Sequence, residues 1–589
     1  MVFFLGCSPS TVQQQKEEEQ ELAEKDPFKA MDLFLTGVNA ETDGDVQKAI
    51  EYYTQALQYD QQPGIYYALA KSNYSLNRLS PALNNIKKCV SLDSTTMDYL
   101  NLMQEIFIAS KLKDSAVVVL ERMLSLDSTR VMTYYDLAAL YEADKPLKAL
   151  DLYNTVLQYA GEQWIVLVRI AELHERLGNF EQAASAVKRL EELDPRNLEL
   201  KKTVVEFYVR AKKYDEAIQY SENIKKLYPD DLENIQRLAS IYIGVEKWDD
   251  AVENYEILLK DKSVRLDAKI EIAATFFYGS FEDSLRLGNA KTLFNVIAKD
   301  TTDWQVSLFL GAISAREGNN DTAKVQFNYA IENAPYNPEA WVRLAGLYFD
   351  NREYAQAIIL LEQAVEKFPK DYYVNFILGL SEAQEGNNEK AVIHLQAAYD
   401  ANPSDPQSAS ALGFTYSTLK QDSAAIVYLQ KAILLNPTDA QTIGVLASIY
   451  NGAENFEKSD SLFNLALAIS PEDPLLNNNY GYSLSERGVR LEDALAMVEK
   501  SLTAEPENAS YLDTKGWVLY QLGRYEEAYT FIKKAIEVAG DREEVTEHLG
   551  DVLVKLGRTA EAKEAYKTAL TFEPENSRIK SKIEQLESK

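Results

Sequence analysis

The pattern of small and large apolar residues repeats along this chain about every 34 residues. In each period an alanine is followed four residues later by a large apolar residue, and a second alanine and then a proline follow. The first alanine and the large residue stand at Ala323 and Phe327, Ala357 and Leu361, Ala391 and Leu395, and Ala425 and Leu429. A fixed period of this length is typical of a repeat protein.

Each period predicts two antiparallel helices. Apolar residues recur at spacings of three and four, as at Trp341, Leu344 and Tyr348, and this places one apolar stripe on each helix. A small residue where two helices cross lets their backbones approach closely, and a proline such as Pro369 ends the second helix. A single hairpin cannot bury both stripes, so neighbouring hairpins must stack into a solenoid.

These phased positions resemble the tetratricopeptide repeat. The residues that carry the resemblance in one unit are Trp341, Leu344, Ala345, Tyr348, Ala357, Leu361, Ala364 and Pro369, and those in the next are Leu378, Gly379, Gly386, Ala391, Leu395, Ala398 and Pro403. The resemblance implies an all-α fold, a right-handed superhelical α-solenoid of helix-turn-helix hairpins.

The most regular small position predicts about sixteen hairpins. It is occupied by Ala49, Ala82, Ala116, Ala149, Ala183, Ala217, Ala251, Ala290, Ala323, Ala357, Ala391, Ala425, Ser459, Ala494, Ala528 and Ala562. The predicted organisation is a tether at 1–26, a degenerate array at 27–262, an irregular longer repeat at 263–300, a regular array at 301–574 and a capping helix at 575–589. The irregular repeat is either a hinge between two arrays or a longer first helix followed by a turn.

Composition narrows the class of partner. The chain is 46% hydrophobic and 26% charged, with 91 acidic against 61 basic residues and a net charge of -30. This composition excludes disorder for most of the chain, and it argues against a nucleic-acid partner because phosphate binding needs a basic face. The acidity is explained either by a solvated outer surface or by a preference for basic partner segments.

The first residues suggest a membrane anchor. Leu5-Gly6-Cys7 resembles the end of a bacterial lipoprotein signal, whose cysteine receives lipid, although a basic segment and a full apolar segment are missing before it. Either the true start lies upstream or the match is accidental. The repeats between Pro474 and Pro574 also resemble envelope-associated bacterial tetratricopeptide proteins. These resemblances imply an outer-membrane lipoprotein that faces the periplasm or the cell surface, held to the membrane through Cys7.

Catalytic chemistry is not indicated. The three histidines, His174, His394 and His548, lie in different repeats, and His174 occupies an aromatic position of the repeat, which favours a core role. Cys89 falls where later repeats have alanine, so it is expected to be small and buried. There is no zinc spacing, phosphate-binding loop or nucleophile elbow. We therefore expect no enzyme, no cofactor and no metal.

Binding of other proteins or peptide segments is the remaining function, and helix geometry indicates where the binding surface lies. If the first helix of each hairpin lines the concave face, inner positions lie one residue after the Leu-Gly pair, three before its glycine and four after it. Aromatic residues predicted for this groove are Phe349, Tyr373, Phe376, Phe414, Tyr482, Trp517 and Tyr520, because aromatic side chains give contact area at low entropic cost. At each position the alternative is packing against the next repeat.

Two functions follow from this pattern. The first is an interaction scaffold of the cell envelope that holds a partner polypeptide in its C-terminal groove, for assembly, secretion or envelope biogenesis. The alternative is a cytoplasmic regulatory or targeting subunit of an enzyme complex. Members of the family that grip a C-terminal carboxylate use lysine, asparagine and arginine across three repeats, and Asn478 and Asn479 are followed here by Ser510 and Thr514. Recognition of such a tail is therefore disfavoured.

Overall fold

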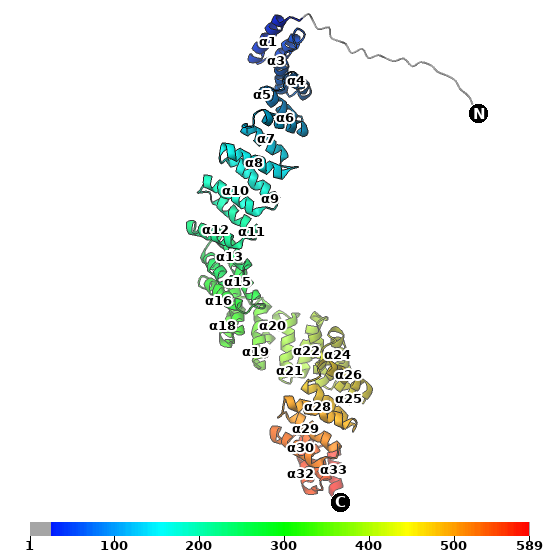
Figure 1. The fold of residues 1–589 in the computed structure, drawn as a ribbon. Helices are drawn as coiled ribbons and strands as arrows, with labels where there is room; N and C mark the ends of the chain where they lie inside the picture. The colour runs from blue at the N-terminus through cyan, green and yellow to red at the C-terminus, as the bar shows by residue number, and fades with distance from the viewer. Residues whose placement is uncertain (1–24, 588–589) are drawn as a thin grey trace, which may run out of the picture. The chain divides into compact units, whose positions relative to one another are not determined.

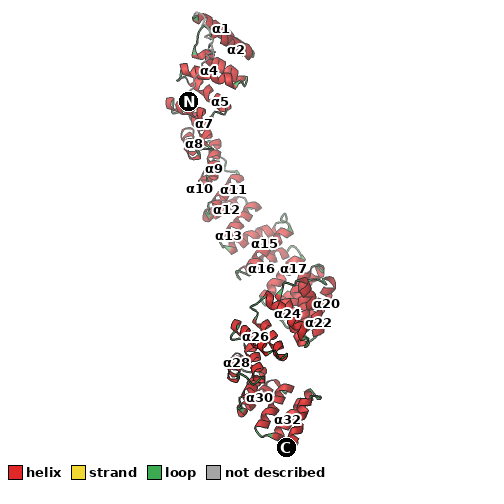
Figure 2. Cartoon of the chain, turned by 90° about the vertical axis from the view of Figure 1, so that its right-hand side faces the viewer, coloured by secondary structure: helices red, strands yellow, loops and turns green. Residues whose placement is uncertain are grey.

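The computed structural model describes residues 25–587, and these residues form 33 α-helices and no strands. Figures 1 and 2 show the helices following one another along the chain. The predicted lipidation site at Cys7 and the first 24 residues of the predicted tether lie outside the described residues. All-α architecture is therefore confirmed for the described part of the chain.

The chain divides between Leu258 and Leu259 into two compact units. The helices that begin in the first unit are α1 (Pro27–Thr42), α2 (Val46–Ala56), α3 (Pro63–Ser75), α4 (Leu79–Leu92), α5 (Met97–Ala109), α6 (Lys113–Leu126), α7 (Val131–Tyr141), α8 (Pro146–Ala160), α9 (Trp164–Arg176), α10 (Phe180–Leu193), α11 (Leu198–Arg210), α12 (Tyr214–Leu227), α13 (Leu232–Gly244) and α14 (Trp248–Lys260).

The second unit contains the remaining helices. They are α15 (Leu266–Gly279), α16 (Arg286–Ala298), α17 (Trp304–Arg316), α18 (Asn320–Asn333), α19 (Pro338–Asp350), α20 (Tyr354–Lys367), α21 (Tyr372–Gln384), α22 (Asn388–Ala401), α23 (Pro406–Thr418), α24 (Asp422–Leu435), α25 (Ala440–Gly452), α26 (Phe456–Ile469), α27 (Pro474–Glu486), α28 (Leu491–Ala504), α29 (Ala509–Gln521), α30 (Tyr525–Ala539), α31 (Glu543–Lys555), α32 (Thr559–Phe572) and α33 (Ser577–Glu587).

Helices α1 to α32 pair into sixteen hairpins, and α33 follows the last one. Within each unit a helix packs mainly against the helices one or two places away along the chain. This nearest-neighbour packing is the arrangement of a solenoid. The prediction of about sixteen stacked hairpins with a final helix is confirmed. The predicted internal borders at 262 and 300 stay predictions.

The crossing inside a hairpin depends on a small residue facing a large one. A Cβ added at Gly379 of α21 would lie 2.7 Å from Leu395 Cγ on α22, and Leu395 is fully buried. The same relation holds between Gly413 and Leu429, where the distance would be 2.6 Å. Any side chain at these glycines would push the paired helices apart.

The ends of the helices follow from local sequence. Helix α20 ends at Lys367, two residues before Pro369, and the carboxylate of Asp371 then accepts a hydrogen bond from the Val374 N–H at 2.9 Å to cap α21. Such a cap satisfies a free amide of the first turn. The turn after α21 uses Gly386, whose φ of 83° is favourable for glycine.

In the second unit, the first helices of the hairpins lie on the inner side of the curve. Successive first helices contact each other, as α27 and α29 do and as α29 and α31 do. The second helices α28 and α30 lie farther apart. Because the first helices are more closely spaced than the second helices, the stack curves toward the first helices. The residues of the first helices that point away from the second helices form the inner face of the stack.

Two further sequence predictions concern the first unit and the irregular repeat. Cys89 is fully buried as a free thiol, and burial, with a smaller effect from the Asp93 charge, raises the pKa of its thiol to about 12. In the irregular repeat, residues 280–285 join α15 to α16. Phe276 and Phe277 of α15 are buried, whereas Phe281 in the connection is exposed.

Candidate functional site

The seven predicted groove aromatics lie on first helices of the second unit, and they differ in exposure. Tyr373 on α21 is 61% exposed. The other six are half-buried: Phe349, Phe376, Phe414, Tyr482, Trp517 and Tyr520. Their assignment to a partner-binding groove stays a prediction, and their contacts decide what each can offer to a partner.

Among the predicted groove aromatics of the middle repeats, Tyr373 is the exposed one. Phe376 packs on the core formed by α22 and α23, and it stacks on Tyr372 with 5.4 Å between ring centroids. Tyr373 is instead directed to a cavity of about 420 Å³, which it lines together with Val342 and Arg343 of α19. An exposed ring beside a cavity can contact a partner without rearranging the core.

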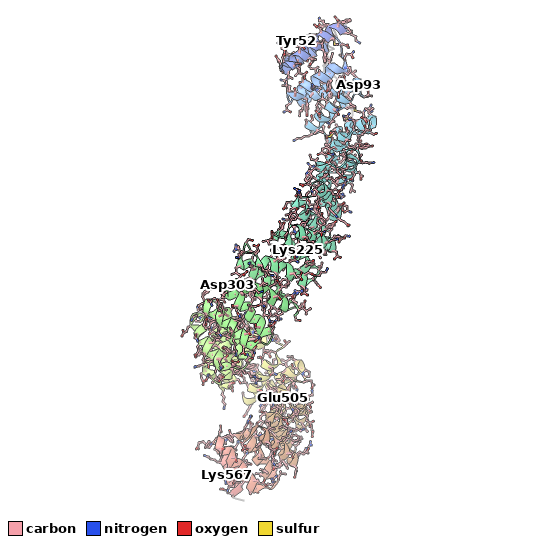
Figure 3. The ribbon with its side chains drawn as sticks, turned by 90° about the vertical axis from the view of Figure 1, so that its left-hand side faces the viewer. Tyr52, Asp93, Lys225, Asp303, Glu505 and Lys567 are labelled. Carbon is pink, nitrogen blue, oxygen red and sulfur yellow. The ribbon has the colours of Figure 1, made fainter. Side chains whose placement is uncertain are left out.

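Three first helices near the C-terminus are linked by side chains across the inner face. The hydroxyl of Tyr482 on α27 donates a hydrogen bond to the Glu544 carboxylate on α31, so this bond passes over α29. Burial and the Glu544 charge raise the pKa of Tyr482. Figure 3 labels Glu505, which follows α28, and Lys567 on α32, and α29 and α31 lie between these two residues in the chain.

Trp517 of α29 is held inside a column of rings. It stacks on Tyr520 with a centroid distance of 4.7 Å and on His548 of α31 with a distance of 4.1 Å. Its indole N–H donates a hydrogen bond to the Glu486 carboxylate on α27. Residues 517 and 520 are three apart, so they lie on one face of α29. Trp517 therefore stabilises contacts between repeats.

The histidine of this column is buried and is paired with a buried carboxylate. His548 and Asp513 are each 6% exposed, and Nδ1 of His548 is 3.1 Å from both carboxylate oxygens of Asp513. Burial opposes the charged form of the imidazole, but the hydrogen bond and charge of Asp513, with the charges of Glu544 and Glu486, outweigh it and raise the pKa of His548. The pair links α29 to α31.

A polar cavity opens beside these contacts, and we call it the C-terminal pocket. Its volume is about 240 Å³. It is lined by Asn478, Asn479 and Tyr482 of α27, by Ala509, Ser510, Asp513 and Thr514 of α29, by Ala535 and Ala539 of α30, and by Gly540, Arg542, Glu544 and Val545. Asn478 is 6% exposed, and its Oδ1 receives no hydrogen bond from any residue that the structure describes. Buried amide oxygens are usually paired, so this one is unusual.

Sequence reasoning predicted Tyr482 for the groove and considered Asn478 only as part of a carboxylate-binding set, which it disfavoured. Asn478 stands three residues before Gly481, and Asp513 stands three before Gly516, so both occupy a position that the spacing rule assigns to the inner face. Asp513 was not considered as a binding residue, and neither residue was predicted for the groove. The spacing could have found them, but the pairing of Asp513 with His548 depends on how two repeats stack.

Neither a metal-binding cluster nor a membrane-spanning helix is found among residues 25–587. Between residues 25 and 587, no group of three or more histidine, cysteine, aspartate or glutamate side chains is placed to hold a metal ion. Over the same range, every helix is too short or too polar to cross a bilayer.

Family comparisons identify the repeats. The tetratricopeptide repeat profile matches residues 138–198, 168–231, 310–372 and 342–406, and a second tetratricopeptide repeat profile matches residues 406–439. Residues 490–569 match the profile of anaphase-promoting complex, cyclosome, subunit 3. The chain thus carries tetratricopeptide repeats in both units. No curated protein matches the chain significantly.

Solved structures with a similar arrangement have low sequence identity. The crystal structure of the APC/C hetero-tetramer Cut9-Hcn1 is 14% identical, with a TM-score of 0.39, and the match covers 83% of this chain and 96% of that one. The structure of Naa15/Naa10 bound to HypK-THB is 14% identical, with a TM-score of 0.37 and coverage of 95% and 96%. A tetratricopeptide repeat protein from Parabacteroides merdae is 18% identical, with a TM-score of 0.37 and coverage of 42% and 98%.

Proposed function

We propose that this protein is a non-catalytic scaffold that holds a segment of another polypeptide against the inner face of its second unit. The observation that carries the proposal is a pair of cavities on that face which no side chain between residues 25 and 587 fills. One lies beside the exposed Tyr373, and the other is the C-terminal pocket. Tetratricopeptide repeats provide the scaffold for such binding, because stacked hairpins form an extended concave surface.

A partner on this face would meet different surfaces at the two cavities. Tyr373 offers an open aromatic ring, and apolar contact with such a ring contributes affinity at low entropic cost. The C-terminal pocket offers buried polar groups, which fix the orientation of a bound group more than they add affinity. An extended segment that reaches both cavities would gain from the two contacts together.

Site-specific photo-cross-linking tests the proposal. A photoreactive phenylalanine analogue is placed at Tyr373 or at Ser510, which is exposed at the C-terminal pocket. Matched controls carry it at Asn328 of α18 and at Lys567 of α32, which are exposed on second helices. We expect one protein to be cross-linked from both inner positions and from neither control, and to re-form the complex when purified. Equal cross-linking from inner and outer positions would refute the binding face.

The proposal also places the protein at the cell envelope, as a lipoprotein of the outer membrane facing the periplasm or the surface. Its support is the sequence Leu5-Gly6-Cys7, which resembles a lipoprotein cleavage site. Mass spectrometry of the mature N-terminus tests it. A diacylated or triacylated cysteine as the first residue is the expected result. An unmodified Met1 would favour the cytoplasmic alternative.

A further inference from the structure

The C-terminal pocket contains a buried hydrogen-bond acceptor with no donor. The amide nitrogen of Asn478 donates weakly to Asn479 Oδ1 at 3.4 Å, whereas Asn478 Oδ1 receives no hydrogen bond although its residue is 6% exposed. A buried unpaired acceptor is unfavourable unless a ligand supplies the donor. The position of this oxygen in the lining of an open pocket shows where such a donor would arrive.

Three other polar residues of the pocket, Asp513, Thr514 and Glu544, offer acceptors. Asp513 is 6% exposed and receives one donor, the Nδ1 of His548, although a carboxylate can accept about four hydrogen bonds. The hydroxyl of Thr514 already donates to the Ser510 carbonyl, so its remaining capacity is as an acceptor. Glu544 adds a second carboxylate at the exposed edge. The pocket therefore suits a group that carries several N–H donors and a positive charge.

The size of the pocket restricts the ligand. Its volume of about 240 Å³ lies below the range of roughly 300–1,000 Å³ that is usual for small-molecule sites. The space suits one side-chain head group of a longer polypeptide. Arg542, which is exposed, adds a positive charge to the lining. His548 pairs with Asp513 from outside the lining and offsets part of the charge of that carboxylate. Asp513 still has free acceptor positions, and Glu544 adds a second carboxylate to the lining.

We propose that the C-terminal pocket binds a lysine or arginine side chain of the partner segment, whose N–H groups donate to Asn478 Oδ1 and to the Asp513 carboxylate. This inference rests on the proposed function and specifies the chemistry of the partner. The face of the Tyr482 ring, which also lines the pocket, offers a cation–π contact to the same head group. The net charge of -30 attracts basic segments from a distance.

Selection from a library of random twelve-residue peptides on the purified full chain tests this inference. We expect the enriched peptides to share one lysine or arginine at a fixed position. Replacing that residue by norleucine in a synthetic peptide should weaken binding about tenfold or more, because charge-assisted hydrogen bonds are lost. Replacing arginine by citrulline removes the charge and two of the five N–H donors, so it should also weaken binding; unchanged binding of the citrulline peptide would overturn the inference.

Two substitutions of Asn478 assign the effect to the pocket. Asn478→Asp places a charge at the unpaired acceptor and should increase the affinity for the lysine peptide roughly three- to tenfold. Asn478→Leu removes the acceptor at similar side-chain volume and should lower this affinity. Asn328→Asp on α18 adds the same charge at an exposed site far along the chain and should leave binding unchanged. A gain of affinity in Asn478→Asp cannot result from misfolding.

The outcomes separate this inference from the scaffold proposal. Enriched peptides that lack a shared cation would overturn the inference, and so would peptides whose affinity is the same for wild type, Asn478→Asp and Asn478→Leu. If the photoreactive residue placed at Tyr373 or Ser510 still cross-links such peptides, the scaffold proposal stands without the cation site. Selection that yields no peptide binder at all would also overturn the inference, and the scaffold proposal then depends on the cross-linking result.

Discussion

Replacing Gly516 by alanine should destabilise the hairpin formed by α29 and α30. A Cβ at this position would lie 2.4 Å from Ile532 Cγ1 and 3.2 Å from the Ala528 carbonyl oxygen. Ile532 is fully buried, and a β-branched side chain in a helix has one strongly preferred rotamer. The clash can therefore be relieved only by moving α29 away from α30.

The magnitude follows from two opposing effects. Overpacking of a close-packed contact costs about 1–3 kcal/mol, and alanine gains about 1 kcal/mol over glycine in helix propensity. Because the new contact would be much shorter than the roughly 3.5–4.0 Å of a normal carbon contact, we expect the cost to prevail. With the overpacking cost at about 2–3 kcal/mol, in the upper part of its range, the net loss in the free energy of unfolding should be about 1–2 kcal/mol.

Gly346→Ala on α19 is the matched control. Apart from its own helix backbone, a Cβ at this helical glycine would have no heavy atom of the described residues within 4 Å, so alanine gains its helix propensity without a clash. We expect this variant to be more stable than the wild type by about 1 kcal/mol. The two substitutions are chemically identical, and they differ only in what faces the glycine.

Hydrogen–deuterium exchange read by mass spectrometry is the suitable assay, because hairpins of a solenoid open locally. In Gly516→Ala, amides of α29 and α30 should exchange about 5 to 30 times faster. In Gly346→Ala, amides of α19 and α20 should exchange more slowly. Unchanged exchange in Gly516→Ala, or a shift of the same sign in both variants, would refute the argument that small-against-large contacts set the helix spacing.

Three further outcomes are expected. The folded-state pKa of His548 is raised, so its stabilising contribution is complete below its unfolded pKa of about 6.5 and is lost as pH rises through the folded pKa. Amide exchange in α29 and α31 should therefore become faster over that pH range, and Asp513→Asn should abolish this pH dependence. Burial raises the thiol pKa of Cys89 to about 12. In a chain whose other cysteine is replaced by serine, Cys89 should react with an aromatic disulfide reagent at pH 8 only after unfolding in urea. Prompt labelling of the native protein would contradict the burial of Cys89. Tyr482→Phe removes the hydrogen bond to Glu544 and should cost about 1 kcal/mol, seen as faster exchange in α27 and α31; exchange equal to the wild type would show that this bond contributes nothing.

The polar contacts of the C-terminal pocket show how far the spacing of residues could lead. The rule that placed Tyr482 on the inner face places Asn478 there too, because the two are four residues apart on one helix. The same rule could not show that Tyr482 donates to Glu544, which lies 62 residues away. It also could not show that Trp517 is held between Tyr520 and His548.

The sequence by itself determined the helical class, the number of hairpins and the positions where helices cross. These features depend on spacings of three, four and about 34 residues, which act within one hairpin or between neighbours. Only the tertiary structure decided which inner side chains remain available to a partner. That outcome depends on the small rotation between successive repeats, which brings α27, α29 and α31 close enough to share contacts. A local pattern does not encode that rotation, so the unpaired oxygen of Asn478 appears only once the hairpins are stacked.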